Sequence, residues 1–242
     1  MYDYGEACPI SRATSVLCER WTLQIIREMM LGATRFSEFQ KYLPRISPSL
    51  LNSRLRLLVD HGIIVRKRIP EKRGYEYHLA PAGKALRPLM VELGKWGMHW
   101  IYDGLSDDQL DAVTLLRDIA VLLDTDALPG GETVMQFTFT DLDETPRRYI
   151  LIQEDKREVC VENPGYEVDV YFRSTLRTLS EIWWGEVGLR DACSCEALKV
   201  LGSPVYTRNL SKWFPISAFA TENRKFPGNE AKEQRTEASA PP

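Results

Sequence analysis

The 242-residue sequence lacks the patterns that would place it in a membrane or in an oxidising compartment. No apolar run approaches the roughly 18 residues that a membrane span requires, and the first residues, MYDYGEACPI, contain no basic segment followed by an apolar one. The five cysteines are odd in number and irregularly spaced, which argues against a disulfide framework. The sequence therefore predicts a cytoplasmic protein without membrane contact.

The residue patterns of catalytic sites are also absent. The three histidines, His61, His78 and His99, are not spaced with a nucleophile. Cys193 and Cys195 lie close together, but no second Cys/His pair completes a zinc site. The chain has no glycine-rich phosphate loop. We therefore expect no enzyme, no bound metal and no cofactor.

Charge is distributed unevenly along the chain, although the net charge is only −3. Residues 1–104 carry 16 Lys and Arg against 10 Asp and Glu, whereas the remainder carries 15 against 24. Within residues 41–87 there are 11 basic and 3 acidic residues. A basic block on a weakly acidic protein is typical of a surface that binds a polyanion. A solvated basic face would give the same count.

Two short helices joined by a tight turn are predicted inside this basic block. Phe36, Phe39 and Leu43 recur at helical spacing, and Pro44 ends that helix. Ser47 and Pro48 then supply an N-cap and a first helical residue, and we expect the second helix over 49–61, ended by Gly62. This layout is typical of a helix-turn-helix.

The second helix is amphipathic, and its polar face suits a DNA groove. Six apolar residues share one side: Leu50, Leu51, Leu55, Leu57, Leu58 and Val59. Short polar side chains and an arginine occupy the other side: Ser49, Asn52, Ser53, Arg56 and Asp60. The residues of this helix expected to contact DNA are Ser47, Ser49, Asn52, Ser53 and Arg56. Arg54 lies at the margin of the apolar side, where it either reaches a phosphate or pairs with a carboxylate of its own domain.

A basic β-hairpin is predicted directly after this helix. The strands are expected over 63–69 and 75–79, joined by a turn that carries Lys72 and Arg73. Both tip residues are expected to contact phosphates or a minor groove. A helix-turn-helix followed by a basic hairpin is a winged helix-turn-helix, a pattern more specific than either part. The sequence therefore predicts that the partner is double-stranded DNA.

Residues 5–101 resemble the HxlR family of bacterial winged-helix regulators. Its most specific pieces here are Cys8-Pro9-Ile10, Glu19-Arg20-Trp21-Thr22-Leu23, Arg35-Phe36-Ser37-Glu38-Phe39, Ile46-Ser47-Pro48 and Ala80-Pro81-Ala82-Gly83. The resemblance implies a transcription regulator that binds an inverted repeat as a homodimer, and a redox-sensing role for Cys8. Cys18 stands where the family usually has glycine, which adds a second thiol near the first.

A heptad-like apolar seam supports the homodimer independently. Pro81 opens a helix along which five large side chains follow at spacings of three and four: Leu86, Leu89, Leu93, Trp96 and Trp100. Pro88 is expected to kink this helix early. The seam either packs inside its own domain or joins two subunits. We favour the intersubunit role, because the preceding helices already supply a core for so small a domain.

The pattern changes near Gly104, and a second domain is expected over 105–221. An amphipathic helix over 105–124 precedes strand-like runs at 133–140, 148–153, 158–162 and 167–172, and helical patterns resume at 174–184 and 203–214. Residues 107–215 resemble a sterol-carrier-protein-like domain, which implies an α/β fold with a mainly antiparallel sheet and an apolar ligand pocket. The whole chain is thus α+β, with a DNA-binding and dimerisation domain over 1–104 and a disordered tail over 222–242.

Two effectors and two functions remain open at this point. An apolar small molecule in the second domain, with Trp183 and Trp184 lining its pocket, is the favoured effector, although such a pair also suits a core. Oxidation of Cys8 is the other effector, since the first helix and Arg12 would lower its thiol pKa. A transcription regulator is the leading function. The alternative is a lipid or small-molecule carrier whose winged helix serves only for dimerisation.

Overall fold

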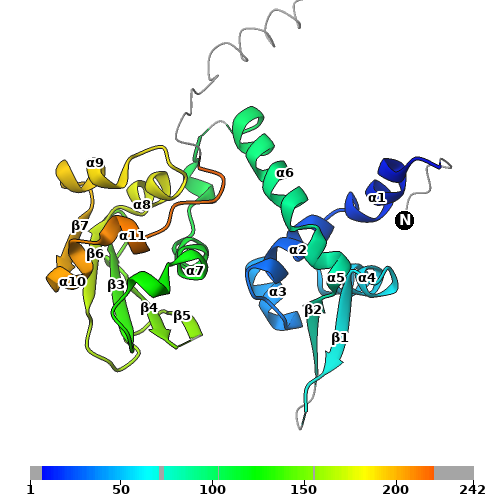
Figure 1. Ribbon diagram of the computed structural model, residues 1–242, viewed down its shortest axis with the longest axis horizontal. Coiled ribbons are helices and arrows are strands. Elements are labelled where there is room, and N and C mark those ends of the chain that lie inside the picture. Colours follow the sequence, from blue (N-terminus) through cyan, green and yellow to red (C-terminus); the bar gives the residue numbers. More distant parts are fainter. Residues whose placement is uncertain (1–6, 71–73, 103, 155, 221–242) are drawn as a thin grey trace, which may run out of the picture. The chain divides into compact units, whose positions relative to one another are not determined.

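The computed structural model describes residues 7–70, 74–102, 104–154 and 156–220. The chain divides into two compact units, one up to Leu93 and one from Gly94 onward, and each is described here by itself (Figure 1). Within the described ranges, no helix is both long and apolar enough to cross a membrane. The tail predicted over 222–242 lies outside the described residues.

The first unit is a set of helices with one β-hairpin. Its elements are α1 (Pro9–Leu17), α2 (Thr22–Met30), α3 (Phe36–Tyr42), α4 (Pro48–Asp60), β1 (Ile64–Arg68), β2 (Tyr75–Leu79), α5 (Pro81–Ala85) and the first part of α6 (Arg87–Trp100). Side chains with at most 1% exposure come from α2, α3, α4 and β1 and form its core: Ile25, Ile26, Phe39, Leu51, Leu55, Leu58 and Ile64. The order of α3, α4 and the hairpin confirms the predicted winged helix-turn-helix.

Local signals fix both ends of α4. The Ser47 hydroxyl accepts a hydrogen bond from the Leu50 amide at 3.3 Å, and Pro48 is the first helical residue. At the other end Gly62 has a φ of +67° and donates its amide to the Val59 carbonyl. The helix therefore covers 48–60, one residue earlier at each end than predicted.

The predicted single helix after the hairpin is broken into α5 and α6. The break falls at Leu86, and Pro88 is the second residue of α6. Because proline has no amide hydrogen, Pro88 has no donor for the Lys84 carbonyl four residues earlier. The expected kink is therefore a full separation into two helices.

The second unit contains a five-stranded sheet with helices. After α6 come the 3₁₀ turn η1 (Asp107–Gln109), α7 (Ala112–Leu122), the 3₁₀ turn η2 (Thr125–Ala127), β3 (Thr133–Phe139), β4 (Arg147–Gln153), β5 (Lys156–Cys160), β6 (Val170–Ser174), α8 (Leu176–Trp183), α9 (Leu189–Ser194), β7 (Lys199–Gly202), α10 (Pro204–Thr207) and α11 (Leu210–Trp213). The strand order is β5-β4-β3-β6-β7. Only the β3–β6 pair is parallel, so this sheet is mainly antiparallel, as predicted.

The main core of the second unit lies on one face of the sheet. Alternate residues of β3, namely Met135, Phe137 and Phe139, are buried there with side chains of α7, α8 and α11. The rings of Phe137 and Phe172 stack at 4.5 Å between centroids. Val134 points to the opposite face. The sequence therefore folds into an α+β unit, as expected from its alternating strands and amphipathic helices.

Several element boundaries in the second unit differ from the prediction. Strand β5 begins at Lys156 and not at 158, because its pairing with β4 already starts there, with Lys156 opposite Gln153. Strand β6 ends at Ser174, two residues later than expected. The helical pattern over 203–214 forms two four-residue helices. Helix α9 and strand β7 were not predicted.

Candidate nucleic-acid interface

Helix α4 presents the polar face that the sequence predicts. Ser49, Asn52, Ser53 and Arg56 are all exposed, whereas Leu51, Leu55 and Leu58 on the other side are buried. The apolar side holds the helix in the core, so its backbone is fixed while the polar side faces outward. These short side chains allow close approach to another surface. Their contact with bases stays a prediction.

Ser47 has a structural role as the N-cap of α4. Its hydroxyl caps α4 at Leu50 and also lies 3.2 Å from the Ser49 hydroxyl. Arg45, in the turn before it, is exposed and has no ion-pair partner among the described residues. Arg45 was not among the residues predicted to contact DNA. Its position two residues before the N-cap of α4 makes it an additional candidate cation at this surface.

Arg54 is engaged inside the first unit. Its Nη2 lies 2.6 Å from the Glu19 Oε2, and its Nε donates to the Arg20 carbonyl at 2.9 Å. The Arg54 and Glu19 side chains are only 15% and 21% exposed. Of the two roles considered for Arg54, the structure contains the pairing with a carboxylate. This pair ties α4 to the segment between α1 and α2.

The hairpin that follows α4 carries exposed cations. Strands β1 and β2 pair in antiparallel register, with Arg66 opposite Tyr77 and Arg68 opposite Tyr75. The Arg66 guanidinium lies 3.5 Å from the centroid of the Tyr75 ring, a cation–π contact that orients it. Lys72 and Arg73, predicted at the tip, lie outside the described residues. The described part of the hairpin is therefore basic and exposed.

Cys8 is exposed at the N-cap of α1. The backbone amide of Ser11, then that of Ile10 and the Ser11 side chain, lower the pKa of the Cys8 thiol, because these donors favour the thiolate. By contrast, burial raises the pKa of both Cys160 and Cys193. Of these three thiols, Cys8 combines the greatest exposure with the only lowered pKa.

Helix α6 carries large apolar side chains in solvent. Leu89, Leu93, Trp96 and Trp100 are between 44% and 59% exposed. Leu86, the first residue of the predicted seam, is half-buried against the core of the first unit. Four of the five seam residues are thus only about half covered within this chain, which disfavours the alternative that the seam packs inside its own domain.

Trp183 and Trp184 line a cavity of about 180 Å³ in the second unit. Trp183 is almost fully buried in the core and Trp184 is half-buried, with the two rings in a T-shaped arrangement. The rest of the wall comes from η1, the loop residues on either side of it, α7 and α8. The tryptophan pair therefore serves both the core and a cavity. Among the residues that the structure describes, no group of His, Cys, Asp or Glu is arranged to hold a metal ion.

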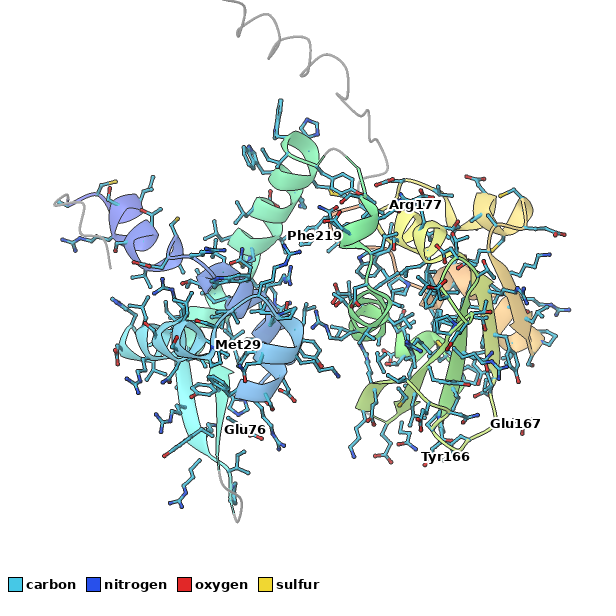
Figure 2. The ribbon with its side chains drawn as sticks, turned by 180° about the vertical axis from the view of Figure 1, so that it is seen from behind. Met29, Glu76, Tyr166, Glu167, Arg177 and Phe219 are labelled. Atoms are coloured by element: carbon cyan, nitrogen blue, oxygen red, sulfur yellow. The ribbon has the colours of Figure 1, made fainter. Side chains whose placement is uncertain are left out.

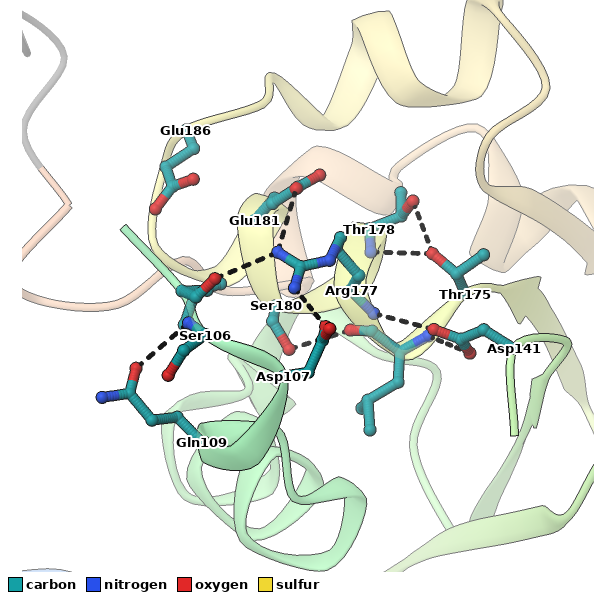
Figure 3. Close-up of polar contacts among 12 residues, drawn as sticks. Ser106, Asp107, Gln109, Asp141, Thr175, Arg177, Thr178, Ser180, Glu181 and Glu186 are labelled. Atoms are coloured by element: carbon teal, nitrogen blue, oxygen red, sulfur yellow. Dashed lines mark hydrogen bonds and ion pairs between the residues drawn. The ribbon is translucent and has the colours of Figure 1, made fainter. Parts of the chain in front are cut away.

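Arg177 holds one wall of this cavity in place (Figure 3). Its guanidinium contacts the Asp107 carboxylate, donates to the Leu105 carbonyl at 3.2 Å and lies 4.0 Å from Glu181. Asp141 accepts hydrogen bonds from the Leu176 and Arg177 amides at the start of α8. These contacts fix η1 against α8, and no pattern in the sequence predicts them.

Comparison with known proteins places the similarity in the first part of the chain. Residues 16–104 match the model of the HxlR-like helix-turn-helix family. The HTH-type transcriptional regulator YvaP of Bacillus subtilis is 39% identical over 107 residues, which cover 43% of this chain and 99% of that protein. An HTH-type transcriptional regulator of Synechocystis is 33% identical over 101 residues, 41% of this chain and 75% of that protein.

Solved structures show a similar extent of likeness. The reduced form of the transcriptional regulator YodB from B. subtilis is 32% identical, covering 41% of this chain and all of that one, with a TM-score of 0.37. The reduced form of the redox regulator HypR is 28% identical, covering 37% of this chain and 90% of that one, with a TM-score of 0.36.

Proposed function

The chain belongs to the HxlR-like helix-turn-helix family, and we propose that it is a transcription regulator that binds double-stranded DNA as a homodimer. The observation that carries the proposal is α4: a capped helix whose apolar side is buried and whose polar side, with Asn52 and Arg56, is exposed. The basic hairpin follows it directly. A carrier protein that used this unit only for dimerisation would need neither feature.

In this proposal α4 enters the major groove. Asn52 and Arg56 contact base edges, since an amide and a guanidinium each form paired hydrogen bonds to a purine. Ser47, Ser49 and Ser53 contact bases or the adjacent phosphates, and the hairpin with Lys72 and Arg73 contacts phosphates or the minor groove. Arg54 acts indirectly, because it holds α4 to Glu19.

The homodimer forms through the exposed face of α6. Packing this face against its copy covers Leu89, Leu93, Trp96 and Trp100 around a two-fold axis. Two-fold symmetry places the two α4 helices on an inverted repeat, with half-sites about one DNA turn apart or a multiple of it.

Two effectors remain in the proposal. The favoured one is a small apolar molecule bound by the second unit at the cavity beside Trp183 and Trp184. With about 180 Å³, this cavity lies below the roughly 300–1,000 Å³ of typical ligand sites, so the molecule is small. The other effector is oxidation of Cys8, supported by its exposure and its lowered thiol pKa. The likeness of the second unit to a sterol-carrier-protein-like domain stays a prediction.

A DNA-binding titration tests the proposal. The full chain is titrated against labelled fragments of the DNA upstream of its own gene, with Asn52→Ala and Arg56→Ala as test variants. Each is expected to weaken specific binding by about 1–3 kcal/mol and to relax the preference at one position per half-site. Arg190→Ala removes an exposed cation from α9 and serves as the matched control. If both test variants bind the fragments like the wild type, the assigned orientation of α4 is wrong.

A further inference from the structure

A cavity of about 530 Å³ lies in the first unit, bounded by the end of α2, the β1–β2 hairpin and helices α5 and α6. Its volume falls within the roughly 300–1,000 Å³ of typical small-molecule sites. No residue assigned above to base contacts, to the α6 seam or to thiol chemistry lines it. Figure 2 labels Met29, from the α2 side of this region, and Glu76 on the hairpin.

The inner wall of the cavity is apolar. Met29, Ala33 and Tyr77 line it and are buried, with 5% to 8% exposure. Val65 of β1 also lines it and is 41% exposed, so this valine has no full cover in the chain. Flexible thioether side chains and an aromatic ring suit a flat apolar body, because methionine adapts to irregular shapes.

The rim of the cavity is basic. Lys67, Lys84 and Arg87 line it, and none has an ion-pair partner among the described residues. No carboxylate is among the described lining residues. The neighbouring Glu76 does not line the cavity and is paired with Arg35 at 3.3 Å and with His78 at 3.4 Å. The cavity thus combines an apolar wall with three cations, one each from β1, α5 and α6.

We propose that this cavity binds an organic anion with an apolar body, such as an aromatic carboxylate. The apolar body packs on Met29 and Tyr77, and the anionic group pairs with Lys84 and Arg87. A neutral molecule of the same shape lacks the second interaction and binds more weakly.

Such a ligand would act on DNA binding through the hairpin. Val65 and Lys67 belong to β1 and His78 to β2, so the wing itself forms one wall of the cavity. A ligand that fits one placement of the hairpin better than another shifts the chain toward that placement. This regulatory part rests on the proposed DNA-binding function, whereas the ligand site does not.

Binding is tested by calorimetry on the full chain with 2-naphthoate, and with 2-naphthamide as its neutral counterpart. We expect the carboxylate to bind roughly tenfold more tightly than the amide, and Lys84→Gln/Arg87→Gln to remove that difference. Val65→Trp fills the cavity and should abolish binding of both probes. Arg12→Gln/Lys41→Gln removes two exposed cations elsewhere in the unit and should leave binding unchanged. Equal affinity for the two probes, or naphthoate binding that survives both test variants, would overturn the site.

The regulatory part is tested by repeating the DNA titration at saturating 2-naphthoate. We expect a change of at least about threefold in DNA affinity for the wild type and none for Lys84→Gln/Arg87→Gln. An unchanged wild-type affinity overturns the regulatory part. If the chain binds none of the DNA fragments, the proposed function fails. The calorimetry then still shows independently whether the cavity binds the organic anion.

Discussion

Removing Trp96 is expected to weaken the homodimer strongly. A tryptophan buries up to about 250 Å², and Trp96 is 54% exposed in the single chain. Roughly 130 Å² is thus left for a partner, which corresponds to about 3 kcal/mol at about 25 cal/mol per Å². Two-fold symmetry counts the substitution twice, so Trp96→Ala loses at most about 6 kcal/mol. Alanine keeps part of the contact, and only part of the free energy calculated from buried area contributes to association. We therefore expect the free energy of dimerisation to weaken by about 3 kcal/mol, which raises the dimer dissociation constant roughly 100-fold.

Sedimentation velocity over a wide range of protein concentration measures this constant directly. Leu201→Ala is the matched control, since Leu201 is 68% exposed on β7, in the sheet of the second unit. Trp96 is mostly in solvent, so its loss should leave the far-ultraviolet circular dichroism unchanged. The reasoning is refuted if the wild type is a monomer at micromolar concentration, or if Trp96→Ala dimerises like the wild type.

Three further predictions concern Arg54, the hairpin tip and Cys8. Arg54→Ala removes the ion pair with Glu19 and the hydrogen bond to the Arg20 carbonyl that tie α4 to the preceding segment, so amide hydrogen exchange in α4 should quicken at least about tenfold while exchange in β3 stays unchanged; equal rates in α4 would show that these contacts do not hold the helix. Replacing Lys72 and Arg73 with alanine should weaken binding to all DNA sequences alike and reduce the salt slope by about one unit per lost contact; an unchanged slope would remove the wing tip from the interface. A lowered pKa keeps more of the Cys8 thiol ionised at neutral pH, so iodoacetamide should modify it faster than Cys160, and its rate should reach half-maximum at a lower pH; peptide mass spectrometry over a pH series measures both, and equal rates would contradict the assignment.

The first unit was predictable because its signals are local. Ser47, Pro48 and Gly62 mark both ends of α4 within a few residues of chain, and the period of Leu51, Leu55 and Leu58 identifies its buried side. The contacts of Arg54 were not predictable in the same way. Its partner, Glu19, lies 35 positions away, and only the folded backbone shows that the two side chains meet.

The second unit was harder to predict because the bounds of its edge strands depend on which strands pair in the sheet. Strand β7 has four residues, Lys199–Gly202, and three of them are exposed, so it carries no alternation that marks a strand. It exists because β6 offers a free edge, with Val170 opposite Gly202. The cavity beneath the hairpin was missed for a related reason: Lys67, Lys84 and Arg87 appear in the sequence only as part of a basic count, and folding brings them around Met29 and Tyr77.

The single parallel pair in the sheet sets an order for folding. Strand β3 pairs with β4 and β4 with β5 through short connections, so this meander can form early in synthesis. The other edge of β3 pairs with β6, which is complete only after Ser174 has been added. Until then the apolar β3, with Phe137 and Phe139, presents an open hydrogen-bonding edge of the kind that recruits other chains. The nascent second unit is therefore expected to be most prone to aggregation between the emergence of β5 and that of β6.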